Sequence, residues 1–375
     1  MAAPKLRFKE FDKAFSRNTI KELAKIYVGR DLVEDAYSPI KTETHIYPIY
    51  SNSVDNEGLY GYYNFEEFNF DDDALTVVGR GAGLGKAFYR QGGFGTIGRL
   101  LSLTPKDKSF HPKYLSDYIN DKLIIHNESG GIPQLPRSSL ESYEVVLPSY
   151  EEQTKIASFL STVDEKISQL TQKHELLSQY KQGMMQKLFS QQIRFKADDG
   201  SEFGEWENSY IGNECKITTG NKDTQNKVDD GLYPFFVRSQ TVEKINSYSM
   251  DCEAILTSGD GVGVGKNYHY INGKFDFHQR VYCLYEFSER LIGKYLYIYF
   301  SNYFYDRVKR LSAKNSVDSV RMDMISKMEI KLPCLEEQTK IANLLSAIDQ
   351  KIEVVAQQIE QAKTWKKGLL QQMFV

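Results

Sequence analysis

The sequence has few cysteines, and they are not arranged to bind a metal ion. The four cysteines, Cys215, Cys252, Cys283 and Cys334, form no CxxC pair and combine with no histidine at a metal-ligand spacing. We therefore expect reduced, partly buried thiols. No apolar run approaches the ~18 residues that cross a bilayer. The first residues (MAAPKLRFKEF) also lack the apolar stretch of a signal peptide. These absences predict a cytoplasmic protein without a membrane partner.

The sequence also has no excess of basic residues. Its 375 residues include 47 Lys and Arg against 50 Asp and Glu, a net charge of −3. Because DNA-binding proteins need a basic surface for phosphate contacts, composition alone does not favour DNA as a partner. A near-neutral chain can, however, separate its charges onto different faces. The length is sufficient for two domains of ordinary size.

An internal repeat determines the predicted architecture. The segment LPSYEEQTKIA at 147–157 returns as LPCLEEQTKIA at 332–342. The same register continues without a gap through VDEKI (163–167) and IDQKI (348–352), and through YKQG (180–183) and WKKG (365–368). Weaker likeness joins LRFK (6–9) to IRFK (193–196), and 20–29 to 211–220.

The chain is therefore predicted to contain two copies of one unit, a globular module followed by a long helix. Parts that stay alike are expected to face the same kind of partner, whereas modules that differ are expected to face different targets. The predicted boundaries are 1–148 for the first module, 149–192 for the central helix, 193–333 for the second module and 334–375 for the C-terminal helix.

Apolar residues in both helical segments follow the alternating four- and three-residue spacing of a coiled-coil seam. Each helix of about 40 residues is about 60 Å long at ~1.5 Å per residue. We expect the two helices to pair antiparallel about a pseudo-two-fold axis; ordinary packing against each helix's own module is the alternative. His174, Lys181 and Lys366 fall on the seam and should weaken it, and Ser149 with Glu152 fits a capping box. The expected seam, which could also dock partners, comprises Ile156, Leu160, Val163, Ile167 and Leu170, with Ile341, Leu345, Ile348, Ile352 and Val355.

The modules have a mixed α/β pattern. One helix is expected in each, at about 111–122 and 292–309, and the stripe Tyr295, Tyr299 and Tyr303 is expected to pack in the core. Short strand-like runs occur at 47–50, 75–78, 96–103, 254–257 and 280–285.

Each module contains a glycine-rich run, 79–86 (GRGAGLGK) and 259–266 (GDGVGVGK). The runs lack the glycine and Ser/Thr positions of a phosphate-binding loop. A cofactor-binding GxGxG turn would need a following helix, and strand-like residues follow instead. The remaining interpretation is a hairpin, either a tight structural turn or one whose backbone approaches DNA closely.

Matching loops near the end of each module, 129–135 and 314–320, are rich in Gly, Ser, Asn and Gln. Such residues, with nearby basic side chains, suit contacts to phosphates and base edges; plain solvated loops are the alternative. The candidate DNA-binding residues are Arg30, Lys41, Arg80, Lys86, Ser129, Gln134 and Arg137 in the first module, and Lys222, Lys227, Arg238, Lys266, Lys314, Asn315 and Arg321 in the second.

No catalytic motif repeats between the copies. His45, His111 and His126 have no histidine counterparts, and the sequence contains no Pro-Pro pair for an amino-methylating Asn/Asp-Pro-Pro-Tyr motif. A duplicated enzyme should duplicate its catalytic residues. We therefore expect no catalytic or metal site in this chain.

The alternation of variable modules with the LP-x-x-EEQxKIA helix resembles the specificity subunit of Type I restriction–modification systems. The resemblance covers the whole chain. It implies two α/β target recognition domains separated by two long antiparallel coiled-coil helices. It also implies double-stranded DNA, two modification subunits and motor-nuclease restriction subunits as partners. S-adenosylmethionine, Mg²⁺ and ATP are expected on those partners, and no cofactor on this chain.

The predicted function is that each module reads one half of a bipartite, asymmetric DNA site while the helices set the gap and dock the modification subunits. Two alternatives belong to other classes. One is a stand-alone DNA methyltransferase that uses the GxGxG turns, and the other is a coiled-coil scaffold that does not bind DNA.

Overall fold

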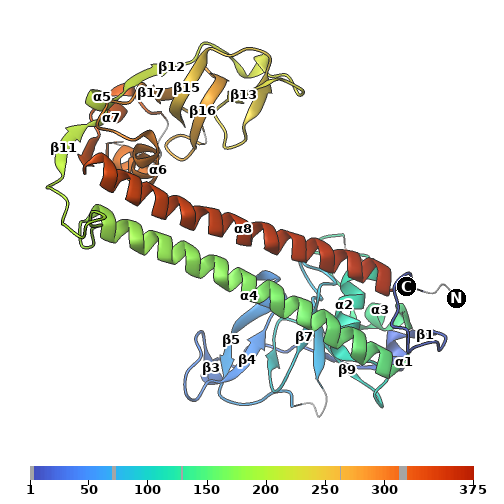
Figure 1. Ribbon diagram of the computed structural model, residues 1–375. Coiled ribbons are helices and arrows are strands. Elements are labelled where there is room, and N and C mark those ends of the chain that lie inside the picture. Colours follow the sequence, from blue (N-terminus) through green and yellow to red (C-terminus); the bar gives the residue numbers. More distant parts are fainter. Residues whose placement is uncertain (1–3, 70–72, 128–129, 262, 312–318) are drawn as a thin grey trace. The chain divides into compact units, whose positions relative to one another are not determined.

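The computed structural model describes residues 4–69, 73–127, 130–261, 263–311 and 319–375. The chain forms two compact units (Figure 1). One unit comprises residues 1–173 with 355–375, and the other comprises residues 174–354. Each unit therefore contains one module together with part of each long helix.

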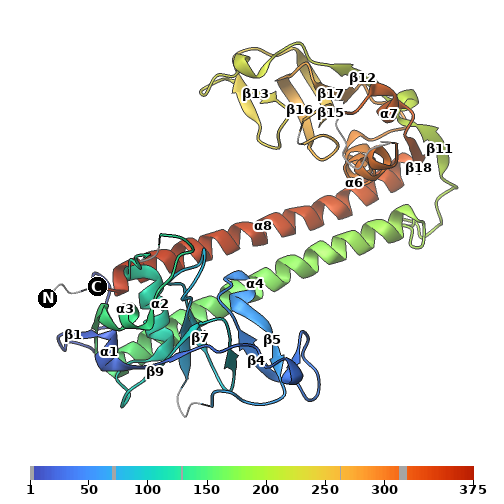
Figure 2. The ribbon, with the colours of Figure 1, turned by 180° about the vertical axis from the view of Figure 1, so that it is seen from behind.

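Two long helices, α4 (Tyr150–Phe189) and α8 (Leu335–Met373), form at the predicted places. In the first unit, Lys366 Nζ of α8 lies 2.5 Å from Asp164 Oδ1 of α4. In the second unit, Lys181 Nζ of α4 lies 2.6 Å from Asp349 Oδ1 of α8. The early part of each helix thus contacts the late part of the other. The antiparallel pairing is confirmed, and Figures 1 and 2 show the helices side by side.

The two ion pairs are equivalent positions of the repeat. Asp164 and Asp349 belong to the VDEKI and IDQKI segments, and Lys181 and Lys366 belong to the YKQG and WKKG segments. Each lysine pairs with the aspartate of the other copy, as a pseudo-two-fold relation requires. Each lysine that was predicted to weaken the seam is thus paired with a carboxylate on the facing helix.

The predicted seam residues contact both the other helix and the modules. In the first unit, Ile156, Leu160 and Val163 share a buried cluster with Tyr114 of the first module and Leu369 of α8. Both alternatives for the apolar stripe, helix pairing and packing on the module, are therefore realised. In the second unit, the corresponding cluster contains Ile341, Leu345 and Ile348 of α8, Met185 and Leu188 of α4, and Leu296 of the second module. Leu170 and Val355 are buried, and Ile167 and Ile352 are partly buried.

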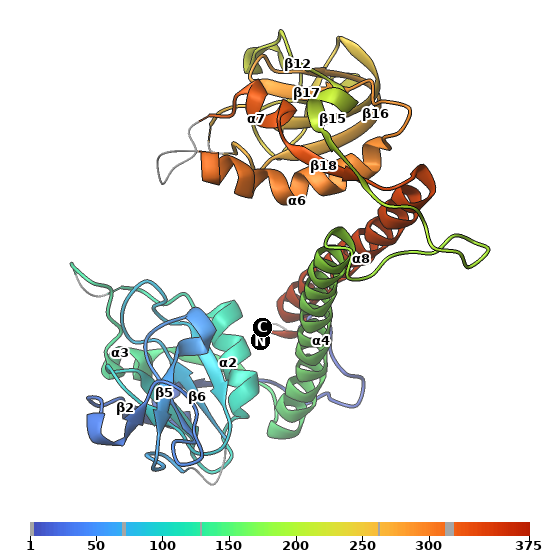
Figure 3. The ribbon, with the colours of Figure 1, turned by 90° about the vertical axis from the view of Figure 1, so that its left-hand side faces the viewer.

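Each module is a mixed α/β fold in which one longer helix packs on a β-sheet (Figure 3). The first module contains β1 (Ser16–Thr19), α1 (Ile20–Leu23), β2 (Ala24–Val28), β3 (Tyr37–Ser38), β4 (Tyr47–Tyr50), β5 (Leu59–Tyr63), β6 (Ala74–Val77), β7 (Ala87–Arg90), β8 (Gly95–Thr96), β9 (Leu101–Pro105), α2 (Pro112–Lys122), α3 (Arg137–Ser142) and β10 (Glu144–Leu147). The second contains β11 (Glu207–Tyr210), α5 (Ile211–Glu214), β12 (Lys216–Thr219), β13 (Tyr233–Phe236), β14 (Glu243–Ile245), β15 (Met250–Ser258), β16 (Tyr268–Phe277), β17 (Val281–Tyr285), α6 (Gly293–Leu311), α7 (Met322–Ser326) and β18 (Glu329–Leu332). The predicted module helices correspond to α2 and α6.

The two modules share one strand order with two differences, one of which is that β3 has no counterpart in the second module. The first has two four-stranded sheets, β2-β9-β6-β7 and β3-β5-β4-β8. The second has a single six-stranded sheet, β12-β17-β15-β16-β13-β14. The long strand β16 lies where the first module has the two short strands β7 and β8, and it joins the two sheets. A separate two-stranded ribbon, β1-β10 or β11-β18, leads into each long helix.

The strand expected at 96–103 is interrupted. Gly98 and Arg99 adopt φ angles of +66° and +67°. These left-handed conformations turn the chain between β8 and β9. The continuous-strand prediction is therefore wrong, because alternating apolar residues do not reveal a single left-handed turn.

The repeated EEQ motif fastens each helix to its own module. Arg7 donates to the buried Glu152 carboxylate from Nε (2.8 Å) and Nη2 (2.7 Å). Arg194 donates to Glu337 in the same way (3.2 and 2.8 Å). The Ser149 hydroxyl accepts a hydrogen bond from the Glu152 backbone at 3.4 Å, but the Glu152 carboxylate binds Arg7. The predicted capping box is thus only half formed, because the Glu152 side chain binds Arg7 and not the Ser149 backbone.

The adjacent glutamine positions the module helix. Gln153 Oε1 accepts a hydrogen bond from the backbone N–H of His111, directly before α2 (2.9 Å). Gln338 Oε1 accepts one from Ile292, directly before α6 (2.9 Å). Both glutamines are buried. Internal packing is therefore one reason why these repeat segments stay alike, besides any shared partner.

Candidate nucleic-acid interface

The described residues of the two glycine-rich runs lie in hairpin turns, and Val262 of the second run lies outside the described residues. Residues 79–86 connect antiparallel strands β6 and β7, and residues 259–266 connect β15 and β16. A strand follows each run, so neither turn opens a helix that could bind a cofactor phosphate. The hairpin interpretation is the one that the structure supports.

In the first module, the hairpin turn pairs with the loop that precedes α3. Leu135 N donates to Gly79 O (2.9 Å), and Arg80 forms a β-bridge with Gln134. The predicted candidates Arg80 and Gln134, which are far apart in sequence, are thereby brought together.

The second module repeats this arrangement before α7. Val320 N donates to Gly259 O (2.7 Å), and Asp260 forms a β-bridge with Ser319. An aspartate thus stands where the first module has Arg80.

Two further segments reach the same place in the first module. Arg30 accepts a backbone hydrogen bond from Gly98 (3.0 Å), beside Arg99. The Asn52 side chain accepts from Gly79 N (2.8 Å) and donates to Gly98 O. The side chain of Asn52 therefore ties the hairpin to the turn that carries Arg99.

The second module repeats the first of these contacts and replaces the Asn52 contact with a backbone hydrogen bond. Lys222 O accepts a hydrogen bond from Gln279 N (2.8 Å), beside Arg280, and Gly259 N donates to Arg280 O (2.7 Å). Five positions are thus gathered in each module. We define the first polar frame as Arg30, Asn52, Arg80, Arg99 and Gln134, and the second polar frame as Lys222, Arg238, Asp260, Arg280 and Ser319.

The two frames differ in charge. Arg30, Arg80 and Arg99 are exposed, and none forms an ion pair with another described residue. In the second frame, Asp260 lies against two arginines, Arg238 and Arg280. Both frames are net positive although the whole chain is not, which is the separation of charge that DNA binding requires.

The model of the Type I restriction modification DNA specificity domain matches this chain twice, at residues 14–179 and 204–364. The chain belongs to this specificity family. The Type I restriction enzyme MjaVIII specificity subunit of Methanocaldococcus jannaschii is 26% identical over 81% of this chain and 79% of its own length. The putative MjaX specificity subunit of the same organism is 27% identical over 72% and 69%, respectively. The crystal structure of the Type I S subunit from M. genitalium has the same fold, with a TM-score of 0.76 at 15% identity, covering 100% of this chain and 99% of that one.

The other predicted DNA-binding residues of this family member lie in different settings. Lys86 is exposed at the end of the first hairpin turn. Lys266 Nζ lies 5.2 Å from the centre of the Tyr305 ring, a cation–π distance. Lys41 is exposed between β3 and β4, and Arg321 is exposed directly before α7.

Two further candidates are partly neutralised. Arg137 pairs with Glu141 at 2.7 Å, and Lys227 pairs with Glu243 at 3.6 Å. These cations therefore have less charge to offer to a phosphate than the unpaired arginines of the first frame. Three predicted residues, Ser129, Lys314 and Asn315, lie outside the described residues.

Sequence reasoning missed Asn52, Arg99, Asp260 and Arg280 as members of the frames. Arg99 and Arg280 could have been found, because each directly precedes a buried residue at the start of an equivalent strand, Leu100 just before β9 and Val281 in β17. Asn52 and Asp260 carried no such signal, since their partners are distant in the chain and the two modules have different residues at these positions.

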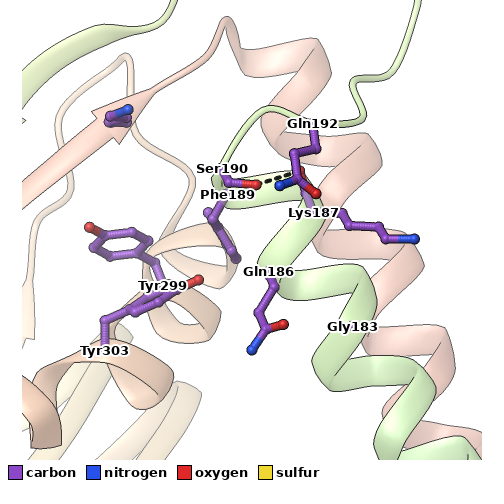
Figure 4. Close-up of a pocket in the computed structure, with 9 residues that line it drawn as sticks. Gly183, Gln186, Lys187, Phe189, Ser190, Gln192, Tyr299 and Tyr303 are labelled. Atoms are coloured by element: carbon purple, nitrogen blue, oxygen red, sulfur yellow. Dashed lines mark hydrogen bonds between the residues drawn. The ribbon is translucent and has the colours of Figure 1, made fainter.

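A surface pocket in the second unit lies between the end of α4 and α6 (Figure 4). Its aromatic wall consists of Tyr299 and Tyr303, whose ring centres lie 5.3 and 5.6 Å from that of Phe189. The described residues that line it include no carboxylate, imidazole or thiol. The hydroxyl and amine groups that line the pocket, such as Ser190 and Lys187, therefore have no carboxylate or imidazole base beside them among these lining residues. Tyr295, the third residue of this stripe, is fully buried, as predicted.

The thiols and carboxylates of the described residues form no recognisable metal centre. Burial raises the pKa of the Cys215 thiol to about 12, so this thiol stays neutral. Across the described ranges, no three His, Cys, Asp or Glu side chains are grouped so that they could hold a metal ion. The described helices also include none with the length and apolarity of a membrane span.

Proposed function

We propose that this chain is a DNA-specificity subunit in which each module reads one half of a bipartite, asymmetric site. One observation carries the proposal. The two polar frames share most of their backbone contacts but present different side chains. Guanidinium, amide and carboxylate groups are the ones that read base edges, and the surrounding cations contact phosphates. A shared frame with different residues therefore supports two unlike half-sites.

We further propose that α4 and α8 set the distance between the half-sites and dock two modification subunits. Those subunits would carry S-adenosylmethionine, and motor-nuclease subunits would carry ATP and Mg²⁺. The chain itself would supply recognition and no catalytic group. The absence of a repeated acid, imidazole or thiol in the two frames supports this division of labour.

The alternative of a stand-alone methyltransferase is disfavoured by the strands that follow both glycine-rich turns. The purified chain incubated with DNA and labelled S-adenosylmethionine should transfer no methyl group unless modification subunits are added. A scaffold without a DNA role is disfavoured by the unpaired arginines of the first frame. The scaffold alternative predicts no salt-dependent DNA binding even in the presence of modification subunits.

The decisive experiment is a module exchange. The chain is expressed with its modification subunits in a host that lacks other adenine methylation, and methylated sites are mapped by long-read sequencing. Replacing residues 30–140 with the matching segment of another family member should change one half-site and leave the other unchanged. A change in both halves, or in neither, contradicts independent reading by the two modules.

The spacer role can be tested by deleting one heptad from each helix in register, 166–172 from α4 and 358–364 from α8. These deletions keep the phase of the seam and retain both the Asp164–Lys366 and Lys181–Asp349 ion pairs. Both helices become shorter by about 10 Å, which corresponds to the rise of about three base pairs of DNA. The methylated site should keep its half-site sequences and lose about three base pairs from its gap. An unaltered gap would contradict the spacer role.

A further inference from the structure

In the second polar frame, the side chains of two arginines lie close to one carboxylate. Arg238 Nη1 donates to Asp260 Oδ1 (3.2 Å), and Arg280 Nε lies 3.7 Å from Asp260 Oδ2. The side chains of Arg238 and Arg280 are 45% and 66% exposed, whereas that of Asp260 is 27% exposed. The carboxylate thus stands between two guanidinium groups that remain open to solvent.

The backbone of Arg238 is fixed by a buried amide. Asn267 Nδ2 donates to Arg238 O (3.1 Å) and lies 3.2 Å from Ser258 Oγ. Asn267 comes from the hairpin that also carries Asp260. The position of Arg238 relative to the carboxylate is therefore set by the hairpin itself.

The backbone of Arg280 is held at both ends. Its N–H donates to Nδ1 of the buried His278 (2.9 Å), and its carbonyl accepts from Gly259 N (2.7 Å). Burial, together with Arg238 and Arg280, lowers the pKa of His278, while Asp223 and Asp260 oppose this effect. The imidazole is therefore neutral near pH 7, as an Nδ1 acceptor requires.

A carboxylate in this place argues against a simple phosphate contact. Phosphate binding depends on net positive charge, and an adjacent aspartate reduces it. Bidentate recognition of guanine O6 and N7 depends instead on the orientation of the guanidinium plane, which a bound carboxylate restrains. The first module has Arg80 at the position of Asp260 and Asn52 at the position of Arg238, so it cannot form the same group.

We propose that Arg238 and Arg280 contact guanine in the half-site of the second module, and that Asp260 is the positioning residue that orients them. This inference rests on the proposed function and extends it to the bases read. Asp260 acts through the arginines; it need not touch DNA.

The test uses the full chain with its modification subunits and adenine-methylation mapping. Arg238→Lys and Arg280→Lys retain the charge but lose the bidentate geometry. Each should lower discrimination for guanine at one position of one half-site about 10-fold or more. Asp260→Asn should lower the discrimination for guanine at the same positions. It should change the overall methylation rate less than it changes this discrimination.

Matched controls lie in the same module, outside the frame. Asp323→Asn removes an exposed carboxylate 3.9 Å from Lys327, and Arg310→Lys changes an exposed arginine of α6. Both should leave the methylated sequence unchanged. Arg99→Lys, in the first frame, should affect only the other half-site. Intrinsic fluorescence of the purified chain verifies that each variant is folded, with Trp206 reporting on the second unit and Trp365 on the first.

The outcomes separate this inference from the proposed function. A second half-site without a G·C pair, or one whose guanine preference survives both arginine variants, overturns the assignment while leaving bipartite recognition intact. A wild-type chain that directs no bipartite methylation overturns both. Relaxed preference in Arg238→Lys but not in Asp260→Asn overturns the positioning role alone.

Discussion

Removal of the Glu337 charge should destabilise the second unit far more than removal of the neighbouring Glu336 charge. Glu337 is completely buried and accepts hydrogen bonds from Arg194 Nε (3.2 Å), Arg194 Nη2 (2.8 Å) and Trp206 Nε1 (3.0 Å). Glu336 is 52% exposed and pairs with Lys340 at 3.2 Å. The variants Glu337→Gln and Glu336→Gln therefore compare one chemical change in two environments.

The expected magnitude follows from these contacts. Breaking a buried ion pair by neutralising one partner costs about 3–5 kcal/mol. Arg194 is 17% exposed and keeps its hydrogen bond to Gly204 O, so part of its solvation is retained. We expect Glu337→Gln to reduce the free energy of unfolding by about 2–4 kcal/mol. Glu336→Gln should cost less than about 0.5 kcal/mol, as is usual for exposed pairs.

The assay is urea unfolding followed by tryptophan fluorescence. The chain has two tryptophans, Trp206 in the second unit and Trp365 in the first. In a Trp365→Phe background, Trp206 reports on the second unit alone. With a slope of about 2 kcal/mol per molar urea, the midpoint of Glu337→Gln should fall by about 1–2 M.

A double-mutant cycle with Arg194→Gln checks that the cost belongs to the pair. The coupling free energy should be about 1–3 kcal/mol, because either single change already breaks the contact. If Glu337→Gln and Glu336→Gln have equal urea midpoints, the contacts of Glu337 with Arg194 do not stabilise the second unit. The likeness of the two EEQ segments must then come from a shared partner.

Three smaller predictions concern backbone space and pH. Gly183→Ala in α4 should raise the free energy of unfolding by about 0.5–1 kcal/mol, since no atom lies within 4 Å of the added Cβ; an unchanged or lowered value in urea unfolding contradicts this. Gly220→Ala should lower it by about 1–3 kcal/mol, because its Cβ would meet the Phe277 carbonyl; a neutral effect in the same assay shows that the backbone yields. Burial lowers the pKa of His278 in the folded chain, so the unfolded chain binds the proton first. The contribution of His278 to the free energy of unfolding should be fully present above about pH 6.5 and decline as the pH falls below it. In thermal unfolding, the decline should be smaller for His278→Gln than for the wild type. Equal pH profiles would falsify this role of His278.

The repeat made much of the architecture predictable. Heptad spacing and the gapless register from 147 to 183 and from 332 to 368 indicated two long helices and their antiparallel partnership. Helices are predictable in this way because their periodicity is local and continues over many turns. What the pattern could not reveal was that Lys181 and Lys366 find Asp349 and Asp164. From the sequence alone, a lysine on an apolar seam is expected to destabilise it, because the residue that faces it on the other helix is not known.

The candidate site was only partly predictable, and the reason is physical. The hairpin turns and their basic neighbours stood out by composition, so Arg30, Arg80, Gln134, Lys222 and Arg238 were found. Their grouping depends on hydrogen bonds between segments that are not adjacent in the sequence, such as the bridge between Arg80 and Gln134. The sequence by itself determined the duplication, the helices and the family. Only the tertiary structure decided which side chains meet, because such contacts leave no periodic trace in the chain.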